Sequence, residues 1–203
     1  KGAGMMTETT VDIEFRSALS ETIPNETLEK VLQDNLEAAP FPVYTKEEYE
    51  FGAAINKSYE VKGSVADLAA KLNPEWEKIL ADRAAIKGWN LNDLVLPYKH
   101  WDFPICASTD VGDVSYICPT AMFFAPTAAA RILEHSWQYV ACNNTSIAHK
   151  GLIYAGQVLA GAGIDLLENP EKVKLAKEEF IRNLDGRTYC CPIPDEVQPD
   201  IEK

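Results

Sequence analysis

Residues 107–150 read ASTDVGDVSYICPTAMFFAPTAAARILEHSWQYVACNNTSIAHK, and this stretch carries the pattern that decides the expected fold. Two apolar segments, Val114–Cys118 and Ala121–Ala125, are separated by a proline and are typical of buried strands. A long helix is expected over residues 145–167, because hydroxyl side chains suited to an N-cap precede a run rich in Ala, Leu and Gly. Strand segments followed by a long helix predict an α/β fold, in which helices cover a sheet.

The polar residues of the same stretch are the candidates for chemistry. Asp110 and Asp113 lie in a turn-prone segment, and His135 ends the connection that precedes the long helix. In open α/β sheets, functional side chains gather on loops outside the strand ends. A neutral imidazole binds a divalent metal ion through one nitrogen when a neighbour fixes the other nitrogen. On the residues alone, two plainer readings stay open: a surface histidine, and aspartates that bond nearby backbone amides in a turn.

Outside this stretch, residues 10–18 have the pattern of a strand, because Val11, Ile13 and Phe15 alternate with charged residues. Such a strand needs partner strands, and none is obvious in this chain. A further short strand is predicted over residues 102–107. N-caps, helical spacing and proline stops predict additional helices over these ranges: Asn25 to Pro40, Lys46 to Lys57, Ser64 to Leu72, Pro74 to Ile86 and Glu171 to Leu184.

Composition narrows the classes of partner. The chain has 203 residues and a formal net charge of −12, which argues against nucleic acids and anionic membranes because both require clustered Lys and Arg. The five cysteines are odd in number and irregularly spaced, which favours a reducing compartment and a cytoplasmic protein over a disulfide framework. We find neither a signal peptide nor an apolar run long enough to cross a bilayer.

Four short motifs carry a resemblance to a known family. They are STDVGDVS at residues 108–115, HSW at 135–137, TSIAHKG at 145–151 and CPIP at 191–194. With these motifs, the chain resembles the C-terminal part of amidohydrolases of the aminobenzoyl-glutamate utilisation B type, which belong to the zinc aminoacylase and carboxypeptidase clan. The resemblance implies that residues 1–20 are the end of an α+β lid and dimerisation domain. Residues 21–203 would be the C-terminal part of a metallopeptidase-like catalytic domain.

The resemblance also implies an activity and a partial site. Family members cleave the amide bond of N-acyl or aminobenzoyl amino acids, such as aminobenzoyl-glutamate, with two zinc or manganese ions per complete site. His135 matches the distal metal ligand, and Ser108, Thr109 and Asp110 match residues that line the site beside the metal. The catalytic glutamate and most metal ligands belong to the family's N-terminal half, so no catalytic residue is expected in this fragment.

The same resemblance sets the expected partners. They are a small N-acyl amino acid substrate, the missing N-terminal half of the protein, and a second copy in a homodimer of the full-length parent. The fragment alone is expected to be inactive and to retain no metal, because catalytic zinc usually has three protein ligands. A competing reading makes the chain a non-catalytic binding or interaction module with a structural acidic turn, since it lacks a nucleophile and a recognisable base.

Overall fold

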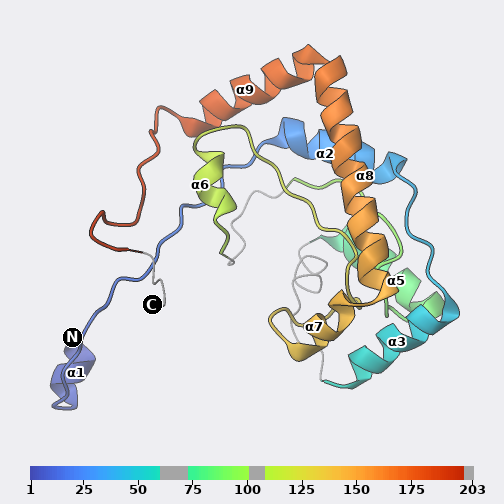
Figure 1. Ribbon diagram of the computed structural model, residues 1–203, viewed down its shortest axis with the longest axis horizontal. Helices are drawn as coiled ribbons and strands as arrows, with labels where there is room; N and C mark the ends of the chain where they lie inside the picture. The colour runs from blue at the N-terminus through green and yellow to red at the C-terminus, as the bar shows by residue number, and fades with distance from the viewer. Residues whose placement is uncertain (60–72, 101–107, 199–203) are drawn as a thin grey trace.

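The computed structural model describes residues 1–59, 73–100 and 108–198, and this part of the protein is helical. Figure 1 shows a long helix, α8, that runs beside α2 and continues into α9. The helices are α1 (Gly2–Met6), α2 (Glu26–Ala38), α3 (Lys46–Lys57), α5 (Pro74–Lys87), α6 (Val111–Ser115), α7 (Trp137–Asn143), α8 (Ser146–Glu168) and α9 (Pro170–Leu184). None of them is both long enough and apolar enough to cross a membrane, among the residues described.

The predicted α/β fold, with a sheet covered by helices, is wrong. In the described ranges the strand pairing amounts to an isolated bridge between Leu91 and Ala129. Of the predicted strand Val114–Cys118, the first two residues close α6 and the others form a turn. Residues 121–125 are not in a regular element, yet their side chains alternate: Phe123 packs against the core while Phe124 is 90% exposed. The alternating apolar side chains of residues 121–125 therefore pack against helices. In the part of the chain that is described, no strand pairs with this segment.

The predicted strand at residues 10–18 is also wrong for this structure. These residues have no regular secondary structure, and Figure 1 shows them in an extended segment that carries α1 away from the body. Ile13 is 79% exposed, and Val11 and Phe15 are each 46% exposed. The proposed domain boundary near residue 20 stays a prediction. The predicted helix over Ser64 to Leu72 and the predicted strand over residues 102–107 lie outside the described residues.

The starts of α2, α3 and α5 were predicted correctly, because each is marked by residues close to it in the sequence, whereas the hydroxyl cap expected at the start of α8 makes no side-chain capping bond. The Asn25 side chain accepts a hydrogen bond from the backbone N–H of Leu28 and begins α2. Thr45 and Glu48 form a reciprocal capping box at the start of α3. Pro74 occupies the first turn of α5, where a missing N–H costs nothing. These confirmed helices, with α8 and α9, make up most of the described body.

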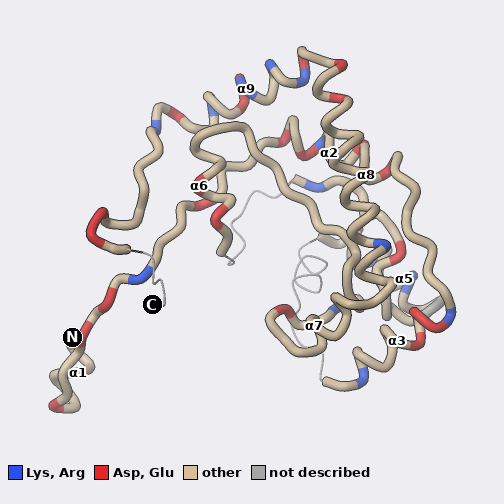
Figure 2. The backbone as a smooth tube through the Cα atoms, in the orientation of Figure 1, with Lys and Arg blue, Asp and Glu red and all other residues tan. Residues whose placement is uncertain are grey.

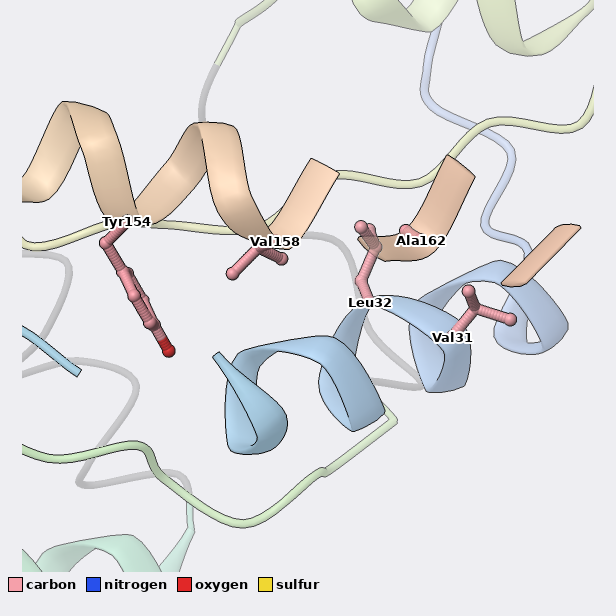
Figure 3. Close-up of a cluster of buried hydrophobic side chains, with 5 residues drawn as sticks. All are labelled: Val31, Leu32, Tyr154, Val158 and Ala162. Carbon is pink, nitrogen blue, oxygen red and sulfur yellow. The ribbon is translucent and has the colours of Figure 1, made fainter. Parts of the chain in front are cut away.

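The central contact of the fold is between α2 and α8. Figure 3 shows Val31 and Leu32 of α2 facing the long helix. From α8, Tyr154, Val158 and Ala162 meet them at helical spacing, and Val158 is fully buried. The Tyr154 hydroxyl donates a hydrogen bond to the carbonyl oxygen of Leu36, so the polar end of this ring is satisfied inside the core. Each large side chain buried in this way contributes about 1.5–3 kcal/mol.

A buried carboxylate of α9 caps α2 from across the molecule. Glu179 is 8% exposed, and its two oxygens accept hydrogen bonds from the backbone N–H groups of Glu26 (2.6 Å) and Thr27 (2.9 Å). Glu179 also accepts a hydrogen bond from the Thr27 hydroxyl at 2.6 Å. These backbone groups belong to the first turn of α2, where no intrahelical acceptor exists. Beside them, the Asn25 amide donates to the carbonyl of Ala176, so α9 and the start of α2 are joined at several points.

A second buried carboxylate joins α3 to the start of α8. Glu48 accepts hydrogen bonds from the Thr45 backbone N–H at 2.6 Å and from the Lys150 ammonium at 2.7 Å, and the Ser146 hydroxyl donates to its other oxygen. Burial alone would raise the pKa of Glu48, but the hydrogen bonds from Lys150 and Ser146, with that of Thr45, outweigh it and hold the pKa below its ordinary value. The ionised form of Glu48 therefore stabilises the fold.

We expect Glu179→Ala to lower the free energy of unfolding by about 2 kcal/mol, because it leaves helix-terminal N–H donors without an acceptor. Urea unfolding followed by circular dichroism measures the change. The matched control is Glu178→Ala on the same helix, whose side chain is 56% exposed and pairs loosely with Lys174. The control should change stability by less than about 0.5 kcal/mol. Equal losses in the two variants would contradict the capping role.

We expect Glu48→Gln to be less stable than the wild type at pH 7, and the difference to shrink as the pH falls below the ordinary carboxyl range. The folded-state pKa of Glu48 lies below that of the unfolded chain, so its stabilisation is complete above the ordinary carboxyl range and is lost as the pH falls through the folded pKa. Urea unfolding at several pH values gives the difference. Glu50→Gln, at a largely exposed position of the same helix, is the control, and its stability relative to the wild type should not change in this way with pH. If the stability difference between Glu48→Gln and the wild type did not depend on pH, this would argue against an ionised Glu48.

Candidate functional site

The three residues predicted to line the site stand together immediately before α6. Asp110 is the N-cap residue of α6 and is exposed, but its side chain makes no capping hydrogen bond. The Thr109 hydroxyl instead accepts the Val111 backbone N–H at 3.3 Å. Ser108 is exposed next to them. The arrangement leaves the Asp110 carboxylate on the surface, where an external hydrogen-bond donor can reach it.

The helix behind this turn is anchored to residues 20–23. The Ser20 hydroxyl donates to the Asp113 carboxylate at 2.6 Å. Ser115, 1% exposed, accepts the Ile23 backbone N–H at 2.8 Å and donates to the Gly112 carbonyl at 2.6 Å. A Cβ atom at Gly112 would lie 2.0 Å from the Ser20 carbonyl oxygen, so only glycine permits this close approach. Asp113 thus has a structural partner, whereas Asp110 faces outward.

His135 lies in a separate loop that is shaped by its neighbour Ser136. The Ser136 hydroxyl donates to the Leu133 carbonyl at 2.6 Å and accepts the Tyr139 backbone N–H at 3.2 Å, which begins α7. His135 itself has a left-handed backbone conformation with φ of 59° and an exposed side chain. The imidazole is therefore accessible from solvent in a loop whose backbone is in a sparsely populated conformation. Histidine is among the few residues besides glycine that adopt this conformation with some frequency.

The loop and α7 enclose an open depression of about 660 Å³. It is lined by Glu134, His135, Ser136, Trp137, Tyr139 and Val140. Trp137 is 65% exposed, and sequence reasoning assigned it no role although it directly follows the histidine and serine of the HSW motif. An exposed indole beside an imidazole provides an apolar wall and a hydrogen-bond donor at one place.

The structure does not bring the acidic turn and His135 into one cluster. The residues lining the depression all lie between 134 and 140, and Figure 1 shows α6 and α7 in different parts of the molecule. Within residues 1–59, 73–100 and 108–198, no three His, Cys, Asp or Glu side chains are close enough to hold a metal ion together. His135 fits the role of one metal ligand, but a complete catalytic site needs about three protein ligands.

The other two histidines have different surroundings. His149 is exposed in the first turn of α8, where its backbone N–H bonds to the Thr145 carbonyl. The Nδ1 atom of His100 lies 3.2 Å from a carboxylate oxygen of Glu29, which also accepts the Tyr98 hydroxyl at 2.8 Å. Burial, together with this hydrogen bond, raises the pKa of Tyr98 and keeps the phenol protonated. The Glu29 cluster therefore joins residues 98–100 to α2, as a structural contact.

Replacement of Asp113 should destabilise the fold more than replacement of Asp110. We expect Asp113→Ala to lower the free energy of unfolding by about 1 kcal/mol, because it removes the acceptor of the Ser20 hydroxyl. Asp110→Ala, at an exposed position without a side-chain capping bond, should change stability by less than about 0.5 kcal/mol. Urea unfolding of both variants tests this, and a larger loss for Asp110→Ala would show that its carboxylate has a structural partner.

Comparison with known proteins relates the sequence to part of a hydrolase. No family model matches the chain, and no solved structure matches it. It is 36% identical over 202 residues to the B subunit of p-aminobenzoyl-glutamate hydrolase from Escherichia coli strain K12, and the match covers 98% of this chain but 41% of that protein. The chain is thus related over nearly its whole length to a component of a hydrolase, and it spans about two fifths of that relative.

Proposed function

We propose that this chain is the C-terminal part of a metal-dependent amidohydrolase that cleaves the amide bond of N-acyl or aminobenzoyl amino acids. The observation that carries the proposal is the 36% identity to the B subunit of p-aminobenzoyl-glutamate hydrolase along almost the entire chain. The exposed imidazole of His135 and the outward carboxylate of Asp110 supply chemistry that such a site needs. In contrast, Asp113 and Glu179 are engaged in holding the fold together.

His135 is assigned as one ligand of a divalent ion, zinc or manganese. Its ring is exposed at a depression, so a ligand nitrogen is accessible, and Ser136 fixes the loop on both sides of the turn. When bound, such an ion polarises an amide carbonyl and lowers the pKa of a bound water molecule. Three protein ligands are usual for catalytic zinc, so the remaining ligands and the general base come from polypeptide beyond this chain. This chain alone should therefore bind metal weakly and be inactive.

Ser108, Thr109 and Asp110 are assigned to substrate or ligand positioning. An ionised aspartate is an acceptor of hydrogen bonds, and both the amide N–H and the aromatic amine of an aminobenzoyl amino acid are donors. An aspartate can equally orient a ligating imidazole from the polypeptide beyond this chain by accepting its second N–H, since His135 lies in a different part of the described structure. Thr109 keeps the turn in shape through its bond to the Val111 backbone N–H. In both roles Asp110 must keep its carboxylate free of capping contacts, as observed.

The proposal includes partners and a compartment. The relative is named as one subunit of its enzyme, so we expect the complete protein to contain a partner subunit or a second copy, in addition to the polypeptide that supplies the rest of the site. Cys118, Cys142, Cys190 and Cys191 are all free thiols in the structure, which supports a reducing, cytoplasmic location.

The test uses the longer protein that contains this chain. We expect His135→Asn to lower hydrolysis of p-aminobenzoyl-glutamate at least 100-fold and to reduce the zinc or manganese content. Asparagine is chosen because it tolerates the left-handed backbone that His135 adopts, so the loop should keep its shape. Inductively coupled plasma mass spectrometry measures the bound metal, and circular dichroism checks the fold.

His149→Asn is the matched control, since His149 is also exposed but lies on the first turn of α8. It should keep both activity and metal content near the wild-type values. Full metal occupancy with normal turnover in His135→Asn would refute the ligand assignment. A wild-type protein that binds no metal and cleaves no N-acyl amino acid would instead favour the interaction module.

A further inference from the structure

Helix α8 has two apolar faces, and the fold uses one of them. The inner face packs on α2 through Tyr154, Val158 and Ala162. On the other side of the helix, large apolar side chains are exposed by 55 to 83%. They are Leu152, Ile153, Leu159, Ile164 and Leu167. At 100° per residue these positions point away from the inner face and form one continuous surface, which we call the outer face of α8.

The outer face is not a solvated helix surface of the usual kind. From residue 151 to residue 164, α8 contains no charged residue. Figure 2 shows the difference from α9, which carries acidic and basic residues along its length. A helix that is apolar on all sides is normally buried within a larger protein, since a surface helix places polar residues toward water. The exposed apolar residues also adjoin each other, unlike isolated surface leucines, which need no explanation.

Small residues give the outer face room for close packing. A Cβ atom built at Gly156 or Gly163 meets nothing within 4 Å. The inner side of the same helix uses its small residues differently, because a Cβ at Gly151 would lie 2.3 Å from the Pro126 carbonyl oxygen. Gly151 thus already accommodates a neighbouring segment, whereas Gly156 and Gly163 leave equivalent space unfilled. With the apolar side chains around it, this space suits another tightly packed element.

We propose that the outer face of α8 packs against the part of a longer polypeptide that this 203-residue chain does not cover. The length of the relative supports this occupant, because more than half of it lies outside the matched region. A second copy of this chain is a less suitable occupant, since each copy has a formal net charge of −12 and like charge opposes association. The expected partner surface is apolar and low in charge, to match Leu159 and its neighbours.

This inference rests on the same larger protein as the proposed function, but it concerns packing and is tested without an activity assay. Loss of metal binding in a His135 variant would not affect the inference about the packing of α8. Conversely, an accessible outer face would refute it while leaving the hydrolase assignment in place.

The experiment measures thiol reactivity at α8 in the protein produced from the reading frame that contains these residues. All cysteines other than the buried Cys142 are replaced by serine, and Leu159→Cys is introduced into this background. Maleimide labelling, followed by intact mass spectrometry, is compared in buffer and in denaturing urea. We expect the native protein to react at least 10-fold more slowly than the unfolded protein at this position. Glu178→Cys on α9, where the side chain is 56% exposed, should differ less than threefold between the two conditions.

Ile164→Cys provides a second probe on the outer face, in case the first substitution disturbs the fold. Reaction of both outer-face thiols as fast as at the Glu178→Cys position would overturn the proposal. A product of 22.5 kDa alone would also overturn it, because no further polypeptide would then be attached. Protection that disappears on dilution, with dimers seen by light scattering, would assign the face to a second copy instead. Slow labelling that is independent of protein concentration, in a longer product, supports the proposal.

Discussion

The packing of α2 on α8 is the interaction on which the rest of the described structure depends. Val31 and Leu32 meet Tyr154 and Val158 in the main apolar cluster, and the Tyr154 hydroxyl is satisfied by the Leu36 carbonyl. Apolar burial is not directional, so this cluster alone would leave the angles of the neighbouring helices undetermined. Buried carboxylates supply the direction: Glu179 joins the start of α2 to α9, and Glu48 joins α3 to the start of α8. Glu179 replaces missing intrahelical hydrogen bonds of α2 with tertiary ones, whereas Glu48 caps α3 locally and binds the side chains of Ser146 and Lys150, so both contacts lie at helix ends.

The sequence predicted the starts of α2, α3 and α5 because their signals are local, but it predicted neither α6 nor α7. Asn25 and Thr45 lie within three residues of the backbone groups they cap, and Pro74 marks a first turn by its own geometry. The strands were predicted wrongly because an apolar or alternating pattern reports which side chains are buried, and not what covers them. Residues 121–125 do alternate, but they lie against helices. The contact of Glu179 with Thr27 spans more than 150 residues, and no local pattern could have indicated it.

The candidate site shows the same division between local and distant information. The family resemblance, and not residue type or spacing alone, led to the choice of Asp110 and His135, and both are exposed in the structure. The sequence could not tell that Asp113 has a structural partner, because Ser20 approaches it from the other end of the chain. Nor could it indicate the left-handed backbone of His135, which depends on how Ser136 bonds within the loop. The closeness of Trp137 to the imidazole was visible in the sequence, but its exposure required the structure.

The metal site proposed for His135 and the exposed outer face of α8 both require groups that the described residues do not supply. A metal site requires converging donors, and an apolar helix face requires a covering layer. Within the described residues no three His, Cys, Asp or Glu side chains converge, and the outer face of α8 is exposed. Both needs are met if additional polypeptide packs on α8, because that packing fixes a new element relative to α7, which directly precedes α8 in the chain. A catalytic site shared between distant segments depends on such packing, since metal ligands must be held within a few tenths of an ångström. Under the proposed function, burial of the outer face of α8 would then also position the further ligands that the proposal requires opposite His135.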